Sequence, residues 1–528
     1  MSLLQTIGFT VLGVQDSGLN AVRERTEVKD LFKLGAAIML TYTVTAVFFL
    51  IPIAAGHLPG DAEARKNNLA ASAWITGLLT TLVPIAVSLL YPMSIYGGKR
   101  YGQLQDNWVN ENTKKELSGV FRLGVLLGLP VVLICALIMF CSESILRNIF
   151  KQNTQIAEIA GGFLRVYALA LLVLGVGRMP LEQMLLSVSK QKGLSVICVS
   201  TFIPGLALAY SLCLNKKINL GLPGLAYGFL AEVIATTLLL ALYLNRNKDL
   251  QSFDFFKQLL RPLDAQDKKA LKKLWQLGWP ILSITLSQVS VPIIFNLLLS
   301  QLKNGSEALS IQSYSSFFIF FMLLIGWAQS QAGAQLVTKK IKTDPSQAFH
   351  IARYGVLAVA ILQLPFCLVA GFFPQAIRLI VSDQEPAADI AEINAVLRLS
   401  AVGVWFENLV NAMVQSLRVI QHRGVVGLLP LVISSLGLWG GLLFSYDLGH
   451  DFRVPGFAAG YAISNFLSFI ALLPVFIKQT RIVSDVQQSP DKRRLLSREP
   501  SVNGVIGWHN SPESTPASTP TAAPSLER

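Results

Sequence analysis

Acidic and amide side chains stand inside long apolar stretches of this sequence. Glu407 is followed by Asn408, Asn411, Gln415 and Arg418, and this spacing places all five along one stripe of a helix. A charged side chain at the centre of a bilayer costs about 2.5–3.5 kcal/mol, so the stripe should face a cavity or partner helices. We interpret Glu407 as a cation-binding or proton-binding residue. The alternative is an interhelical hydrogen-bond seam with Arg418 at the membrane surface.

Two further acidic residues lie in apolar stretches. Arg178 and Glu182 are four residues apart, so they share a helical face and can form a structural ion pair. Glu232 lies about twelve residues into another apolar stretch and has no basic residue near it in the sequence. An acid in this position is a candidate ion-coupling residue, and a structural role is equally open.

Neutral polar and aromatic side chains in the second half of the chain could line a substrate pocket that stacks on an aromatic or cationic molecule. The candidates are Gln288, Tyr314, Trp327, Trp405, Phe406, Asn408, Asn411 and Gln415. The alternative for each aromatic residue is that it faces lipid or packs against another helix.

The amino-acid composition indicates that the chain lies in lipid rather than in water. Of the 528 residues, 52% are hydrophobic and 14% are charged, whereas soluble domains carry about 25% charged residues. The chain is therefore predicted to be an all-α integral membrane protein. The five cysteines form no CxxC pair, and no catalytic or metal-ligand constellation appears, so we expect neither an enzyme nor a bound cofactor.

Apolar windows bounded by charged residues, glycine or proline predict twelve transmembrane helices. Their ranges are 32–56, 69–93, 119–141, 158–188, 192–213, 221–244, 275–300, 306–336, 354–374, 393–417, 425–446 and 455–477. With twelve spans, both termini lie on the same side of the membrane.

The basic residues predict which side that is. Of the 44 Lys and Arg residues, 31 lie on the side of the termini, 9 lie in the opposite loops and 4 lie within spans. Cytoplasmic loops carry such an excess, so both termini and the 245–274 loop are predicted to be cytoplasmic, in a plasma membrane of the bacterial inner-membrane type. This bias accounts for the net charge of +13 without a nucleic-acid partner. We expect a monomer in the lipid bilayer.

The sequence repeats itself after roughly 230 to 240 residues. LFKLGAAI around Gly35 returns as LWQLGWPI around Gly278, and PGLAYG at 223–228 returns as PGFAAG at 455–460. Both halves begin on the same side, so the repeats are parallel, and substrate should bind between or within them. The predicted divisions are an N-terminal segment 1–31, a six-helix lobe 32–244, a basic linker 245–274, a six-helix lobe 275–477 and a disordered tail 478–528.

Three motifs mark corresponding helices of the chain. They are an entry-helix motif, LGxP, in the second half (277–280), an LxxxxxxG stretch ending the fourth and tenth helices (186–193 and 417–424), and a G-x-A-x-G start of the sixth helix (224–228). Their order over about residues 30–477 resembles the multidrug and toxin extrusion (MATE) family of the larger flippase and exporter superfamily. The resemblance implies export of cationic or amphipathic small molecules in exchange for Na⁺ or H⁺.

The same resemblance implies coupling through intramembrane carboxylates, and two of the expected acids are replaced. Ile51 stands where the family has a first-helix aspartate, and Gln288 stands where it has a seventh-helix glutamate. Glu407 aligns with the family's tenth-helix aspartate. By elimination, we expect coupling to depend on Glu407, with the first half acting mainly as a structural counterpart.

Two other functions are compatible with parts of this sequence. A flippase for lipids or lipid-linked saccharides would share the architecture, but it would need a cationic central cavity, and the basic residues here lie mostly at the cytoplasmic rim. A membrane scaffold that transports nothing would account for the replaced acids and the Ser/Thr/Pro-rich tail.

The predicted orientation can be tested with cysteines introduced at Ser489 and Asn304. A membrane-impermeant thiol reagent applied to intact cells should label position 304 and leave position 489 unlabelled, because the charge bias places only position 304 outside. Labelling of position 489 from outside would reject the orientation.

Overall fold

The protein is described here by a computed structural model. It describes residues 43–94, 111–188, 190–215, 220–247, 262–302, 304–340, 345–382, 389–420 and 453–478, with shorter pieces at 28–39 and scattered single residues. Residues 248–261 of the predicted 245–274 linker, most of the predicted eleventh span 425–446 and residues 479–528 of the predicted tail lie outside the described residues.

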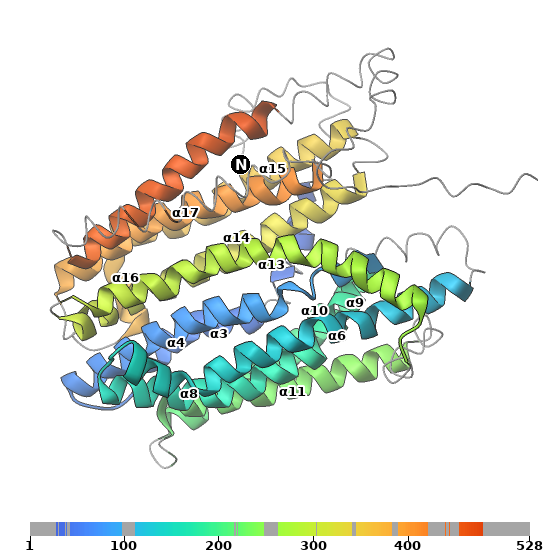
Figure 1. The fold of residues 1–528 in the computed structure, drawn as a ribbon. Helices are drawn as coiled ribbons and strands as arrows, with labels where there is room; N and C mark the ends of the chain where they lie inside the picture. Colours follow the sequence, from blue (N-terminus) through green and yellow to red (C-terminus); the bar gives the residue numbers. More distant parts are fainter. Residues whose placement is uncertain are drawn as a thin grey trace, which may run out of the picture.

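Helices account for the regular structure of the described residues, and the long ones run alongside one another (Figure 1). The first half contains α3 (Thr43–His57), α4 (Ala62–Ser88), α6 (Glu111–Phe140), α7 (Ser142–Ser144), the π-helix η1 (Ile145–Ile149), α8 (Thr154–Val173), the π-helix η2 (Leu174–Arg178), α9 (Met179–Ser187), α10 (Gln191–Leu214) and α11 (Gly221–Arg246). The second half contains α13 (Ala265–Ser300), α14 (Gly305–Lys340), α15 (Pro345–Phe372), α16 (Pro374–Val381), α17 (Ile390–Ile420) and a last helix at Arg453–Lys478.

Nine helical stretches in the described part are long and apolar enough to cross a membrane, and each coincides with a predicted span. The stretch Thr154–Ser187 joins α8, η2 and α9 into one span. Of the remaining predicted spans, the first contains α3 and the seventh lies within α13. The prediction of a helical, multi-pass membrane protein is therefore confirmed.

Helix α13 begins about ten residues before its predicted span, inside the predicted linker. Asp264 and Asp267 form a capping box, in which each carboxylate accepts a hydrogen bond from the backbone N–H of the other residue, at 2.7 and 3.0 Å. Such a box starts a helix by satisfying N–H groups that have no partner within the helix. Asp267 also pairs with Arg122 of α6, so the start of the second half is fastened to the first.

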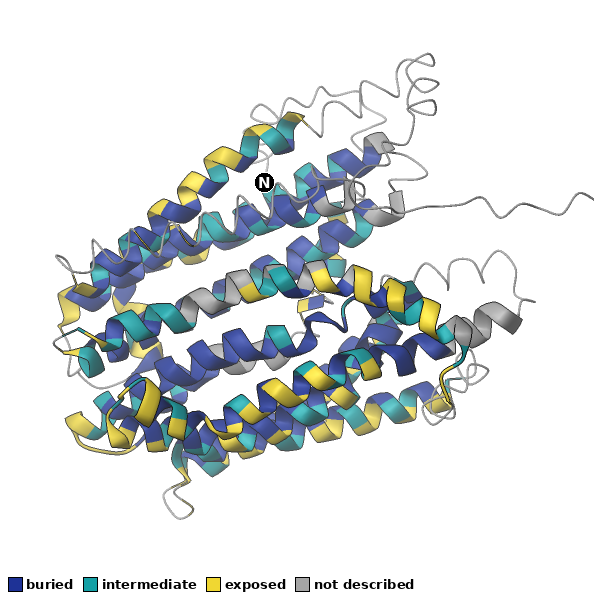
Figure 2. Ribbon diagram, in the orientation of Figure 1, coloured by how far each residue is buried: buried dark blue, intermediate teal, exposed yellow. Residues whose placement is uncertain are grey.

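Helices α4 and α14 form the centre of the bundle. They are the most buried of the membrane-spanning stretches, whereas α10 and α15 are the least buried. Figure 2 colours the ribbon by the burial of each residue. Outward side chains such as Ile203 and Phe366 suit a lipid surface. Helix α4 packs against both α13 and α14, and α3 packs against α14, so the two halves meet along these four helices.

The halves are joined by neutral hydrogen bonds near the ends of the spans that lie away from the termini. Ser72 of α4 donates to Ser313 of α14 at 3.0 Å, and the Asn296 amide of α13 donates to the Ala73 carbonyl at 2.7 Å. The Ser382 hydroxyl, just after α16, donates to the Gly56 carbonyl of α3 at 3.3 Å.

Short helices follow the third and ninth spans, where the sequence patterns indicate only loops. They are α7 with η1, and α16, and each follows the third predicted span of its half. Elements of three to eight residues are too short to show a helical period, which is why the apolar windows missed them. Their matching positions support the internal repeat.

Replacement of Gly228 by alanine should destabilise the protein. A Cβ at Gly228 of α11 would lie 2.2 Å from the Cα of Ala209 of α10, whereas a Cβ at Gly371 of α15 would meet nothing within 4 Å. Overpacking of this kind costs about 1–3 kcal/mol. Thermal unfolding of purified protein should therefore give a lower Tm for G228A than for wild type, with G371A unchanged or slightly higher. Equal Tm values for G228A and G371A would contradict the close packing of α10 and α11.

Candidate functional site

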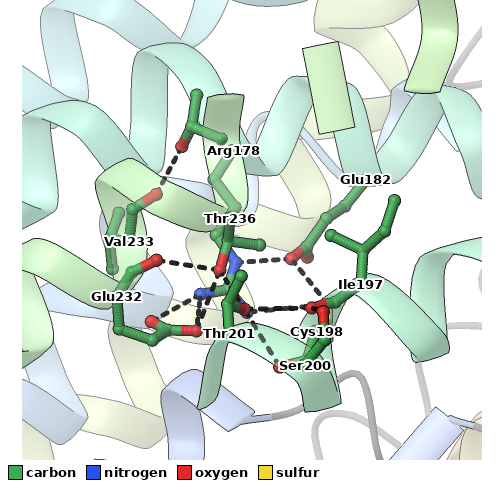
Figure 3. Close-up of polar contacts among 10 residues, drawn as sticks. Arg178, Glu182, Ile197, Cys198, Ser200, Thr201, Glu232, Val233 and Thr236 are labelled. Carbon is green, nitrogen blue, oxygen red and sulfur yellow. Dashed lines mark hydrogen bonds and ion pairs between the residues drawn. The ribbon is translucent and has the colours of Figure 1, made fainter. Parts of the chain in front are cut away.

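One guanidinium group and two carboxylates meet inside the first half of the bundle. Arg178 is the last residue of η2, Glu182 lies one turn later on α9, and Glu232 lies in the middle of α11. The Arg178 Nε donates to Glu182 Oε1 at 2.6 Å, and its Nη1 lies 2.9 Å from both carboxylate oxygens of Glu232 (Figure 3). We call these three residues the charged cluster.

The charged cluster is almost completely removed from solvent. The exposed fractions of the side chains are 0% for Arg178, 9% for Glu182 and 3% for Glu232. Ionised groups survive such burial only when paired and hydrogen-bonded, and a guanidinium has enough N–H donors for two carboxylates. It nevertheless carries a single positive charge, so the fully ionised cluster has a net charge of −1.

Small polar side chains from two helices complete the contacts. The Thr236 hydroxyl of α11 lies 3.0 Å from Glu232 Oε1 and 2.7 Å from the Thr201 hydroxyl of α10. The Cys198 sulfur of α10 lies 3.8 Å from Arg178 Nη2 and 3.9 Å from Glu182 Oε1. The cluster therefore joins α9, α10 and α11.

Local backbone features bring the three charged side chains together. A π-helical turn inserts one extra residue into a helix, and such turns occur frequently at functional sites. Here the π-turn Leu174–Arg178 ends on the arginine. On α10, Gly205 leaves space for Glu232, because a Cβ at Gly205 would lie 2.5 Å from the Glu232 Cβ. Pro204 precedes this glycine within the helix.

The environment of Glu232 differs from the sequence-based interpretation. Glu232 was expected to be an acid without a basic neighbour, and the structure pairs it with Arg178, which is 54 positions away in the sequence. Arg178 and Glu182 do lie in contact, but they do not form an isolated pair. The i, i+4 spacing of Glu232 and Thr236 was a signal in the sequence that polar contacts continue along one face of α11.

The acid of the second half, Glu407, has a different setting. It lies on α17, is half-buried, and accepts a hydrogen bond from the Tyr461 hydroxyl of the 453–478 helix. Gly403 makes this contact feasible, because a Cβ there would lie 2.4 Å from the Tyr461 ring. No basic residue pairs with Glu407 among the described residues.

The adjacent Asn408 points to another helix. Its amide donates to the Met322 carbonyl of α14 at 3.3 Å, and the Gln363 amide of α15 donates to the same carbonyl at 3.0 Å. Gly326 gives these amides room, since a Cβ there would lie 2.2 Å from Asn408 Oδ1. The side-chain oxygens of Asn408 and Gln363 are buried without a hydrogen-bond partner in the described part of the chain. The predicted polar stripe therefore divides between two neighbouring helices.

Two of the aromatic pocket candidates pack within the second half. The Trp405 indole donates to the Ala360 carbonyl of α15 at 3.2 Å. The Phe406 ring contacts the rings of Trp405, Phe466 and Phe469 with centroids 5.0–5.4 Å apart. These contacts agree with the alternative that the aromatic residues pack against neighbouring helices.

The remaining pocket candidates do not gather at one point. Tyr314 is buried and Trp327 is half-buried, and the 13 residues between them correspond to about 20 Å along α14. Asn411 and Gln415 are half-buried on α17, while the side chains of Gln288 and Arg418 lie outside the described part.

Several polar residues of these sites were missed by sequence reasoning. Gln363, Tyr461 and Thr201 each contact a residue of another helix, and their own positions in the sequence give no helical stripe of polar residues. Only the packing of α10, α14 and the 453–478 helix reveals their role.

Comparisons with known proteins identify solved structures that have a similar fold. No protein-family model matches the chain, and no curated protein matches its sequence. Among solved structures, the crystal structure of a eukaryotic MATE transporter matches with a TM-score of 0.64 at 18% identity, covering 87% of this chain and 98% of that one.

Two further solved structures show a multidrug resistance MATE family transporter in different conformations. The inward-facing one matches with a TM-score of 0.63 at 15% identity and covers 84% of this chain and 99% of that one. The outward-facing one matches with a TM-score of 0.60 at 14% identity and covers 86% of this chain and 97% of that one. The chain therefore has the fold of MATE transporters, whose structures have twelve helices, as the sequence motifs predicted.

Removal of the guanidinium from the charged cluster should be strongly destabilising. R178Q would leave two carboxylates buried without a positive charge, which costs about 3–5 kcal/mol. The matched control is R165Q, because Arg165 is half-exposed and pairs with Glu143 at the surface, where an ion pair contributes about 0–1 kcal/mol. Thermal unfolding of both variants tests this expectation.

The triple variant R178Q/E182Q/E232Q should recover most of the stability lost in R178Q, because no unpaired charge remains. If R178Q is as stable as R165Q, the ion pairs of the charged cluster do not hold the first half together.

Proposed function

We propose that this protein is a secondary active transporter that exports cationic or amphipathic small molecules in exchange for Na⁺ or H⁺. The observation that carries the proposal is a half-buried carboxylate, Glu407, which has no basic partner among the described residues of a MATE-type bundle. Transport by proteins with such inward-facing and outward-facing structures supports the same activity here.

Glu407 has the properties that a coupling residue requires. An intramembrane carboxylate whose partner in the described part of the chain is a tyrosine hydroxyl can bind a proton or a cation without first breaking an ion pair. Because its partner Tyr461 lies on a different helix, occupation of Glu407 also alters a contact between α17 and the 453–478 helix. Whatever an ion does to the affinity for substrate, substrate must do to the affinity for the ion.

The buried amides next to Glu407 favour a cationic substrate. The side-chain oxygens of Asn408 and Gln363 are hydrogen-bond acceptors without a partner in the described part of the chain. An unpaired acceptor in a low-dielectric environment attracts donors and positive charge. Together with the carboxylate of Glu407, they give this part of the second half the polarity that an organic cation needs.

A flippase for lipid-linked saccharides is the less favoured alternative. Recognition of a pyrophosphate would require a buried positive charge that is available to the ligand. The guanidinium of Arg178 is buried, but two carboxylates already contact it. The charged cluster therefore does not supply a cationic cavity.

Exchange also requires the two halves to move relative to each other. The described contacts that join them near Ser72, Asn296 and Ser382 are neutral hydrogen bonds. Such bonds contribute about 0.5–1.5 kcal/mol each, so a rocking motion can break them at modest cost. We place both termini in the cytoplasm on the charge bias of the loops and take the transporter to act as a monomer.

The proposal can be tested with E407Q in proteoliposomes, which keeps the shape of the side chain and removes its charge. Uptake of ethidium, a fluorescent organic cation, would be measured with Na⁺ and pH gradients imposed separately. We expect wild type to respond to one of the gradients and E407Q to lose at least tenfold in gradient-driven rate, equivalent to about 1.4 kcal/mol.

E158Q is the matched control, because Glu158 is an exposed glutamate paired with Arg147, and its uptake should equal that of wild type. Equal uptake by E407Q and wild type under both gradients would remove Glu407 from the mechanism. Absence of uptake by wild type under either gradient would contradict the proposed exchange of organic cations.

A further inference from the structure

We propose that the charged cluster of Arg178, Glu182 and Glu232 is a proton-binding site, with the proton carried by the Glu182 carboxyl group. Its use in transport rests on the function proposed above, while proton binding itself does not. The inference assigns an ion-binding role to the first half of the molecule, which the sequence had indicated to be mainly a structural counterpart.

The charge balance of the cluster is the first step of the argument. Arg178 contacts both carboxylates, so neither acid has a positive charge of its own. A net charge of −1 inside a bilayer costs several kcal/mol unless it is neutralised. One proton makes the cluster neutral while every hydrogen bond donated by Arg178 is retained.

Among the described residues, the surroundings of the cluster add only groups that are uncharged at neutral pH. The titratable groups that face it are the Cys198 thiol of α10, the Tyr167 phenol of α8 and the Tyr91 phenol just after α4. Thiols and phenols are uncharged at neutral pH, so none of them balances the second carboxylate. The imbalance must be met by an ion from solution.

A proton fits this position better than a metal cation. The guanidinium already lies between the two carboxylates, and a metal ion would have to displace it and collect several oxygen ligands. No group of three His, Cys, Asp or Glu side chains in the described part of the chain is arranged to hold a metal ion. A proton needs only one free carboxylate oxygen.

Glu182 is the acid that offers this oxygen. Both oxygens of Glu232 are contacted by Arg178, and Thr236 donates a further hydrogen bond to one of them. The described contacts of Glu182 all engage Oε1, which leaves Oε2 free. Protonation forms an O–H bond at Oε2 and breaks an O–H bond of a hydronium ion, which leaves as water.

Protonation of Glu182 would change the strength of the contacts between helices. It weakens the attraction between Arg178 and Glu182 and leaves the guanidinium paired with Glu232 of α11. The link between the π-turn and α11 is thereby favoured over the link along α9. Glu182 lies five residues before Ser187, the last residue of α9, which is about 8 Å along the helix, so protons should reach it from the predicted cytoplasmic side.

Infrared difference spectroscopy of the purified full-length protein tests the proposal without relying on transport. At neutral pH, wild type should show the carbonyl stretch of a buried protonated carboxyl group, which shifts in D₂O and disappears at alkaline pH. E182Q should lose this band because it removes the group. E232Q should lose it too, because Arg178 then balances Glu182 alone and the proton is no longer needed.

Two control variants complete the experiment. E407Q should keep the band, which separates this site from the coupling residue of the second half, and E158Q should keep it as an exposed glutamate. A band that persists in both E182Q and E232Q, or its absence from wild type at neutral pH, would overturn the proposal. If one variant does not fold, the other decides.

The two proposals fail in distinguishable ways. Absence of ethidium uptake by wild type would contradict the transport function and leave the infrared band unaffected. Absence of the band, with uptake that still depends on Glu407, would remove the proton site and leave the transport function in place.

Discussion

The lack of water inside a bilayer is the constraint on which the rest of this structure depends. Polar groups within the spans must find most of their partners in the protein, because lipid offers neither donor nor acceptor. The threonine hydroxyls of α4 donate to carbonyls of the preceding turn, and the Asn408 and Gln363 amides share the Met322 carbonyl. Charged groups within the spans also need partners in the protein, so they occur at few positions in the membrane.

The two halves meet this constraint differently. In the first half, Arg178 and its two carboxylates form a tightly bonded group at the junction of three helices. In the second half, the one hydrogen-bond partner of Glu407 among the described residues is a tyrosine hydroxyl. A duplicated architecture thus contains one acid pair whose charge is mostly balanced from within and one acid whose balance depends on what binds to it.

The sequence was sufficient to predict the long helices that span the membrane, because each span is long and apolar in its own right. Nine predicted spans are confirmed in the described part of the chain. Contacts between helices were harder to predict from the sequence. The pairing of Glu232 with Arg178 joins residues 54 positions apart, and the room for Tyr461 comes from Gly403 on another helix. Such contacts depend on how helices pack against one another, and the periodicity of residues within one helix does not indicate that packing.

The π-turn Leu174–Arg178 makes the charged cluster sensitive to chain length as well as to residue type. Successive residues of a helix are about 100° apart around its axis, so one residue more or fewer rotates everything that follows by that angle. Loss of the extra residue would turn Glu182 and the whole of α9 toward different neighbours while every side chain remained present. Insertions and deletions in this span are therefore constrained even where substitutions would be tolerated.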